Sequence, residues 1–334
     1  MLKKKILFIS ILSLAVCFVF AGVILAEEPE GNVVWATASP IDEVEATIDI
    51  FNEIYPNVRV DAIYGGVGEL ANRIEGEAAD PQIDVWSGGG HTYREALSHL
   101  VRPYESVYDD QFPDNMRAED RTWYAQFTPP QIFMVNTNII SEEDMPQTWA
   151  DLADPKYEGE IVFANPGLSS SAFNQMQLMV AAGGWDLVRD IIDNAVVVSS
   201  SRLTWQGVAN GEYGICMVTE NSAYIVQHDG YPVEILYPED GVNEILTVVS
   251  LIENSPNQRN AELLLDVINS VEVHEILAGP PHFRRSARPD VELHESMVPT
   301  SELNFALTLE EQNVTSEERD ELLQRFDEIF AETQ

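Results

Sequence analysis

Three consecutive hydroxyl side chains at the start of an expected helix form the first candidate site. The apolar run Ile161–Ala164 predicts a short buried strand that ends at Asn165–Gly167, and Ser169, Ser170 and Ser171 follow. Apolar residues then repeat at helical spacing, at Phe173, Met176 and Val180. The first N–H groups of a helix lack intrahelical acceptors and carry partial positive charge, so this turn is suited to an anion. The alternative is a plain helix cap with spare serines.

Small polar residues also occupy five other positions where an expected strand ends or a helix begins. These positions are Thr37 with Ser39, Gly65–Gly68, Ser87–Gly90, Ser199–Arg202 and Thr219–Asn221. Loops at the carboxyl ends of strands bind ligands in α/β proteins, and a cleft between two domains would bring loops from both together. The candidate ligand-binding residues are therefore Thr37, Ser39, Gly66, Gly68, Ser87, Gly88, Gly89, Ser169, Ser170, Ser171, Ser201, Arg202, Thr219 and Glu220.

The region from residue 32 to residue 100 predicts three strand–loop–helix units. Strands are expected at Asn32–Ala36, Val58–Tyr64 and Ile83–Trp86, each followed by a polar loop and an amphipathic helix. Ser39 as helix cap with Pro40 in the first turn marks the first helix start. This succession of units predicts an α/β fold with a parallel sheet.

Two segments are expected to cross between domains. Trp123–Asn136 contains two extended runs separated by a pair of prolines, and Ile245–Ile252 is the expected return crossing. A single amphipathic helix is expected over Asn260–Leu277. The predicted organisation is residues 32–129 with 246–300 as a discontinuous first α/β domain, 130–245 as the second, and 301–334 as an acidic helical segment with Leu322, Phe326 and Ile329 on one face.

The first 26 residues have the layout of a secretory signal peptide. Three lysines precede the apolar run Ile6–Leu25, and cleavage is expected after Ala26. The length of the apolar run leaves an uncleaved membrane anchor as the alternative. We therefore predict a periplasmic protein. Cys216 is then the only thiol of the mature chain, so no internal disulfide is expected, and its apolar neighbours predict a core position.

The chain is strongly acidic. Its formal net charge is −38, and loss of the three signal lysines changes this to about −41. Such a charge repels phosphate backbones and anionic lipid surfaces, so neither nucleic acid nor a membrane surface is expected as a partner. Lys156 is the only lysine beyond the signal, and an acid excess with so few lysines is typical of a surface adapted to high salt.

Five segments together resemble the type II periplasmic solute-binding proteins, in particular the cluster with the ferric-iron and hexose-phosphate receptors of ABC importers. The segments are DPQIDVWSGG, MPQTWADLADPKYEGEIVFANPGLSSSAF, SSSRLTWQGVANGEYGI, EILYPEDG and SPNQRNAELLLDVINS, and the likeness runs from about Val33 to Val291. The resemblance implies two α/β domains joined by crossing strands, with a ligand cleft between them. It also implies a monomeric receptor without cofactor or catalytic activity, which delivers a small solute to an ABC permease in the inner membrane.

The resemblance implies an anion site in this chain but not the iron ligands of the ferric receptors. Ferric members of the cluster use a histidine, a glutamate and a tyrosine pair, and the corresponding places here are Ser39, Gly88–Gly90 and Glu220–Ala223. Hard ferric iron requires anionic oxygen ligands, so no metal site is expected, although His91 and Tyr224 lie nearby in the sequence. In relatives the turn that matches Ser169–Ser171 holds a phosphate or a companion anion.

Two further positions have both a ligand role and a simpler explanation. Arg202 stands where many relatives have another serine, and its guanidinium could clamp a phosphate or carboxylate, or pair with a surface acid. Thr219 and Glu220 match positions that grip sugar hydroxyls in the hexose-phosphate receptors. A solvated loop acid is the alternative for Glu220.

The predicted function is an extracytoplasmic receptor for a small anionic solute, such as a sugar phosphate or a phosphonate. A ferric-iron receptor of the same fold is the first alternative. A dinucleotide-dependent enzyme is the second, because Gly66–Ala71 follows a strand, opens a helix and precedes Asp84. That motif lies in the second strand–helix unit and Asp84 begins a strand, so an enzyme is not expected.

Overall fold

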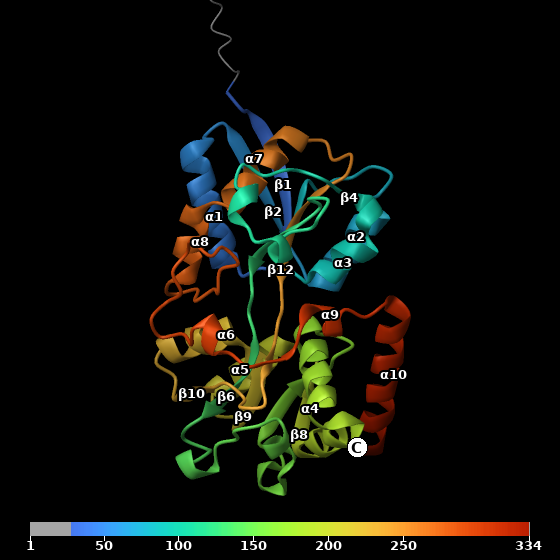
Figure 1. Ribbon diagram of the computed structural model, residues 1–334, viewed down its shortest axis with the longest axis vertical. Coiled ribbons are helices and arrows are strands. Elements are labelled where there is room, and N and C mark those ends of the chain that lie inside the picture. The colour runs from blue at the N-terminus through green and yellow to red at the C-terminus, as the bar shows by residue number, and fades with distance from the viewer. Residues whose placement is uncertain (1–27, 334) are drawn as a thin grey trace, which may run out of the picture.

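The computed structural model describes residues 28–333, which form two α/β lobes joined by extended segments (Figure 1). The predicted signal peptide, residues 1–26, lies outside the described residues. Each lobe has its own sheet because the apolar strands of each half are buried beneath helices of the same half. The predicted α/β class follows from this arrangement.

The first lobe is built on a six-stranded sheet. Its strands, in spatial order, are β2 (Val58–Tyr64), β1 (Gly31–Thr37), β3 (Val85–Ser87), β12 (Thr247–Ile252) and β4 (Val101–Arg102), with β5 (Tyr124–Phe127) also paired to β12. β1 runs parallel to β2 and β3, as the three sequence units predict, whereas β12 is antiparallel to its neighbours. The helices of this lobe are α1 (Ile41–Ile54), α2 (Val67–Gly76), α3 (His91–Ala96), α7 (Gln258–Ile268) and α8 (Val271–Ala278).

The second lobe is built on a five-stranded sheet. Its strands are β10 (Val233–Leu236), β6 (Gln131–Asn136), β9 (Ile215–Thr219), β7 (Ile161–Ala164) and β8 (Ala195–Val198) in spatial order. β7 is parallel to both β8 and β9, while β6 is antiparallel to β9 and β10. Its helices are α4 (Ser170–Asn194), α5 (Ser201–Ala209) and α6 (Glu220–His228).

The chain passes between the lobes in extended segments. β5 belongs to the first sheet and β6 to the second, and Thr128–Pro130 separates them. The return passage ends in β12, and just before it β11 (Val242–Asn243) pairs with β13 (Phe305–Leu307) of the C-terminal segment. Figure 1 shows these extended segments running between the upper and lower lobes.

The C-terminal segment packs against the second lobe. It contains α9 (Leu309–Gln312) and α10 (Ser316–Thr333), and α10 runs beside α4 (Figure 1). Phe326 and Ile329 are fully buried in the same core cluster as Phe163 and Trp149, with Leu322 at its margin. The predicted apolar face of this helix is therefore confirmed, and we refer to residues 301–333 as the C-terminal tail.

Two local expectations are wrong. Pro40, not Ser39, is the N-cap of α1, and no side chain donates or accepts a capping bond there. The single helix expected over Asn260–Leu277 is broken in two, because the Ser270 hydroxyl accepts a hydrogen bond from Val273 N and starts α8. α4 runs to Asn194 with a kink at Gly184, whose φ of 71° is readily accessible only to glycine.

Candidate functional site

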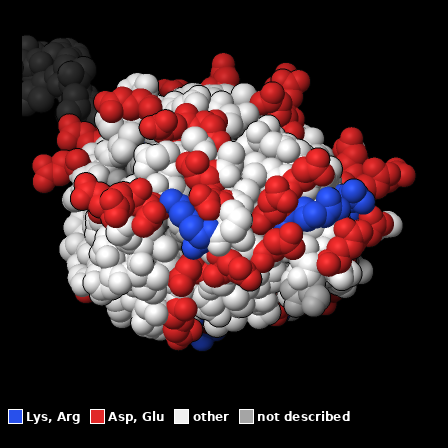
Figure 2. Space-filling model, turned by 90° about the horizontal axis from the view of Figure 1, so that it is seen from below, with Lys and Arg blue, Asp and Glu red and all other residues white. Residues whose placement is uncertain are grey.

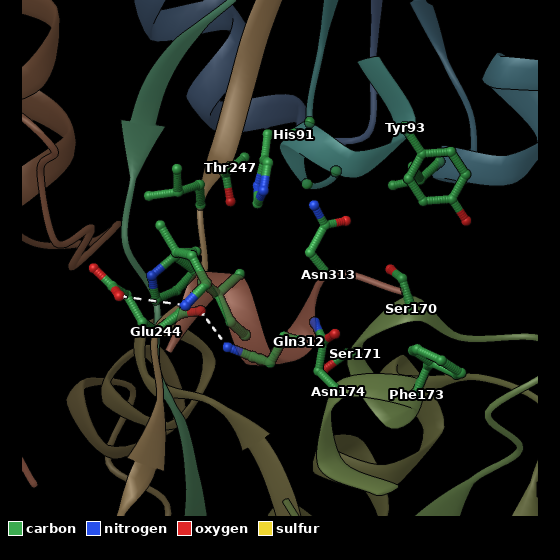
Figure 3. A pocket seen from close by; sticks show the side chains of 18 of the residues that line it. His91, Tyr93, Ser170, Ser171, Phe173, Asn174, Glu244, Thr247, Gln312 and Asn313 are labelled. Atoms are coloured by element: carbon green, nitrogen blue, oxygen red, sulfur yellow. Dashed lines mark hydrogen bonds between the residues drawn. The ribbon is translucent and has the colours of Figure 1, made fainter. Parts of the chain in front are cut away.

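A cavity of about 670 Å³ lies between the two lobes. The first lobe contributes the loops after β1 and β3 and the start of α3, and the second lobe contributes the first turns of α4 and the end of β9. The passage Glu244–Thr247 and the C-terminal tail complete the lining. In Figure 3, His91 and Tyr93 of α3, Ser170 and Asn174 of α4, and Asn313 of the tail surround this space.

The N-terminus of α4 is the most strongly polar part of the second-lobe wall. Ser169 is the N-cap, and its hydroxyl accepts a hydrogen bond of 3.2 Å from Ala172 N. Ser170 and Ser171 line the cavity. Within residues 28–333, neither of their backbone N–H groups has an acceptor and the Ser170 hydroxyl has no partner. This helix end therefore presents unsatisfied donors to the cavity.

The hydroxyl of Ser171 is held by two buried glutamines. Gln131 of β6 donates to Ser171 Oγ at 3.0 Å, and Gln175 donates to Gln131 Oε1 at 2.6 Å. Both glutamine side chains are buried, at 0% and 1% exposure. The network fixes the orientation of Ser171 because each buried amide has few alternative partners.

Ser39 and the glycines Gly88 and Gly89 line the cavity from the first lobe. Both glycines have positive φ, at 87° and 73°. An added Cβ would lie 2.9 Å from the Cβ of Ala38 at Gly88 and 2.4 Å from Val67 Cγ1 at Gly89. These positions therefore require glycine because the loop packs closely against its neighbours.

Thr37 and Ser87 lie behind the cavity wall and do not line it. Both side chains are fully buried. Ser87 Oγ accepts from Trp35 Nε1 and donates to Thr37 Oγ1, each at 2.8 Å, and Thr37 Oγ1 also accepts from Ser39 N. Their hydroxyls thus connect β1 and β3 and support the loop that carries Ser39.

Four other candidate residues also lie outside the cavity lining. Gly66 and Gly68 are exposed at the start of α2, and only Val67 between them reaches the cavity. Ser201 Oγ hydrogen-bonds to Ser169 Oγ at 2.6 Å and so braces the cap of α4. Arg202 is exposed on α5.

Thr219 lines the cavity, whereas Glu220 next to it is buried away from it. Arg285 binds the Glu220 carboxylate through two hydrogen bonds, of 3.0 Å from Nε and 2.5 Å from Nη2, and the Tyr237 hydroxyl donates to the same carboxylate. The side chains of Glu220 and Arg285 are 1% and 3% exposed. Burial and this carboxylate raise the pKa of Tyr237, which keeps its proton as a donor.

Several lining residues were not among the sequence candidates. His91 and Tyr93 extend from α3, Glu244 precedes β12, and Arg284 follows α8. Burial lowers the pKa of His91 although Glu95 and Glu244 oppose this effect, so the imidazole is neutral near pH 7 and can donate or accept a hydrogen bond. No local motif marks these positions.

The C-terminal tail is the largest unexpected contributor. Its lining residues are Leu309, Gln312, Asn313, Val314, Thr315 and Arg319. Gln312 Nε2 donates to the Glu244 backbone oxygen at 2.7 Å, and Asn313 Nδ2 donates to Glu95 of the first lobe at 3.3 Å (the former is drawn in Figure 3). The tail therefore contacts both lobes beside the cavity.

Comparison with known proteins identifies the chain. A model of the family described as bacterial extracellular solute-binding proteins matches residues 96–295, more than half of the sequence. The chain belongs to this family. A protein of Haemophilus influenzae is 28% identical over 258 residues, 73% of this chain and 74% of the relative. Iron uptake protein A1 of Synechocystis is 27% identical over 144 residues, 40% of this chain and 39% of the relative.

Solved structures of similar proteins have the same fold. The periplasmic binding protein AfuA of Actinobacillus pleuropneumoniae aligns with a TM-score of 0.81 and 23% identity over 91% of this chain and 99% of the relative. HitA of Pseudomonas aeruginosa aligns with a TM-score of 0.76 and 19% identity over 90% and 99%. These likenesses confirm the predicted two-domain periplasmic-binding-protein fold.

Membership of the family also gives the broad role. The protein is a solute-binding component of an ABC importer, with a small solute and a membrane permease as its partners, and it is a binding protein, not an enzyme. It works outside the cytoplasm. None of the helices between residues 28 and 333 is long and apolar enough to cross a membrane.

Proposed function

We propose that this solute-binding protein takes up a small anionic solute, of the class of sugar phosphates or phosphonates. The observation that carries the proposal is the α4 N-terminus, where Ser170 and Ser171 present backbone and side-chain donors to the cavity. Helix N-termini favour anions because orphan N–H groups and the helix dipole act together. The AfuA structure, described with fructose 6-phosphate bound, supports the same class of solute.

The polar surroundings of this helix end fit an anion that carries hydroxyl groups. Asn174, Gln312 and Asn313 line the same cavity and can donate or accept, while Glu95 and Glu244 can accept from solute hydroxyls. The acidic groups face the cavity from the first lobe and the passage, not from α4. We propose that the anionic group of the solute lies at α4 and its hydroxyls lie toward the other wall.

Binding is proposed to close the two lobes over the solute. The passages near residues 126–135 and 245–251 are the proposed hinges, and the loops with Ser39 and Gly88–Gly89 would cover the solute from the first lobe. The closed, monomeric form would then dock on the permease. We propose, as part of this closure, that the moving domains end at residues 129, 245 and 300.

Mass spectrometry of small molecules released from freshly purified protein tests the solute class. Isothermal titration with glucose 6-phosphate, fructose 6-phosphate and inorganic phosphate then measures affinity. Replacing Ser170 and Ser171 together by alanine should weaken the binding of phosphorylated probes about fivefold for each hydrogen bond lost, since each contributes about 1 kcal/mol. Ser98→Ala is the matched control, because Ser98 is exposed in the first lobe and lies outside the cavity lining. Equal affinity of the double variant and the wild type would move the anion site elsewhere.

A ferric ligand is the competing proposal. It is favoured by the oxygen and nitrogen donors of His91, Tyr93 and Glu244 along the cavity, and by the iron-bound HitA structure. Within residues 28–333, however, no group of three or more His, Cys, Asp or Glu side chains is placed to hold a metal ion. Titration with ferric citrate distinguishes the two proposals, because tyrosine coordination to ferric iron produces a visible absorption band that binding of a phosphorylated sugar does not.

A further inference from the structure

Two arginines line the cavity, and their surroundings differ. Arg284 is bound by Glu43, with hydrogen bonds of 2.8 Å from Nε and 2.9 Å from Nη2, so its charge is compensated. Arg319 of the tail has no carboxylate within 4 Å among residues 28–333. Its guanidinium carbon instead lies 4.3 Å from the centre of the Phe173 ring. Arg319 is therefore the uncompensated cation in the described part of the cavity wall.

The position of Arg319 is fixed by the second lobe. Phe173, on which it stacks, lies in the first turns of α4, two residues after Ser171. α10, which carries Arg319, is anchored by the buried side chains of Phe326 and Ile329. The guanidinium is thus held beside the same helix end that presents unsatisfied N–H groups.

Most arginines in the described residues pair with a carboxylate; Arg319 is one of four that do not, with Arg94, Arg202 and Arg259, and it is the one of these four that lines the cavity. The sequence has 56 acidic and 18 basic residues, so acceptors for a guanidinium are abundant. Figure 2 shows how widely Asp and Glu cover the face seen from below, with few Lys and Arg among them. Stacking on an aromatic face orients a guanidinium and leaves its N–H groups free for planar, bidentate bonds to phosphate or carboxylate.

We propose that Arg319 determines the specificity of this receptor by binding the anionic group of the solute together with Ser170 and Ser171. The inference rests on the proposed function, because it assigns a further ligand to the same anion site. It adds that the C-terminal tail, which lies beyond the segment matched by the family model, supplies the positive charge of the site. The solute expected from this arrangement carries an anionic group, with one or two negative charges, at one end and hydroxyl groups at the other.

Titration of Arg319→Gln and Arg319→Lys with glucose 6-phosphate, inorganic phosphate and glucose tests this assignment. Arg319→Gln should weaken binding of the phosphorylated sugar tenfold or more, as expected for loss of hydrogen bonds to a charged group, whereas Arg319→Lys should retain part of the affinity. Arg202→Gln is the matched control, because Arg202 also lacks an ion pair among the described residues but is exposed on α5. This control should bind as the wild type does.

The outcomes separate the two proposals. If Arg319→Gln binds glucose 6-phosphate as tightly as the wild type while the Ser170 and Ser171 double variant does not, the inference is wrong and the proposed function stands. If Arg319→Gln loses thermal stability without ligand but keeps its affinity, the arginine only packs on Phe173 and the inference is also wrong. If the wild type binds neither glucose 6-phosphate nor inorganic phosphate, both the proposed function and the inference are overturned.

Discussion

Removal of the Glu220 carboxylate tests whether this residue binds solute or holds the fold together. Glu220 begins α6 of the second lobe, and Arg285 lies on the segment after α8. The backbone carbonyl of Arg285 accepts a hydrogen bond from Thr128 N, beside the first passage between the lobes. The pair therefore fastens α6 to the region where the lobes meet. Glu220→Ala would leave the Arg285 guanidinium buried with only Val298 O and Thr300 Oγ1 as acceptors.

Breaking a buried ion pair by removing one partner costs about 3–5 kcal/mol, because the remaining charge has lost its compensation. We expect the lower part of that range, since two of the hydrogen bonds of Arg285 remain. Urea unfolding followed by tryptophan fluorescence measures the loss. Glu234→Ala is the control, because Glu234 is exposed on β10 of the same lobe and should change the free energy of unfolding by less than about 0.5 kcal/mol.

A double variant sharpens the test. Glu220→Ala combined with Arg285→Met removes both charges, so it should be more stable than Glu220→Ala alone. The reasoning is refuted if Glu220→Ala unfolds at the same urea concentration as the wild type but binds the solute more weakly. That result would mean that Glu220 binds the solute, as the sequence analysis expects.

Three further predictions follow from buried side chains. Phe326→Ala should lower the free energy of unfolding by about 3–5 kcal/mol, because it opens a cavity in the second-lobe core; an unchanged urea midpoint would show that the tail is not anchored there. Burial and Arg288 lower the pKa of His274 from 6.5 to about 3. Between pH 3 and pH 6.5 the unfolded chain therefore binds a proton at His274 that the folded chain does not. The free energy of unfolding should then fall by up to about 1.4 kcal/mol for each unit that the pH decreases. Urea unfolding at pH 4–7 should show a smaller slope for His274→Gln. Burial raises the pKa of the Cys216 thiol, so a disulfide reagent should label Cys216 only after unfolding, and rapid labelling of the native protein would contradict the structure.

Hydrophobic periodicity was sufficient to predict most of the fold. The strands β1, β2, β3 and β7 and the start of α4 at the three serines lie within a few residues of their predicted positions, because each depends on a short run of sequence. One helix break was less predictable: Ser270 interrupts an apolar pattern that continues across it. At this point a capping bond outweighs the periodicity.

The sequence by itself determined the acidic character of the chain, its two α/β halves and the donors at Ser170 and Ser171, since composition, periodicity and a helix start are all local properties. Only the tertiary structure decided which polar residues share the cavity. Thr37, Ser87 and Glu220 are buried in internal hydrogen bonds, while Arg319, more than a hundred residues from α4 in sequence, lies on Phe173. Residues distant in the chain meet through packing of whole elements, and no local pattern encodes that meeting.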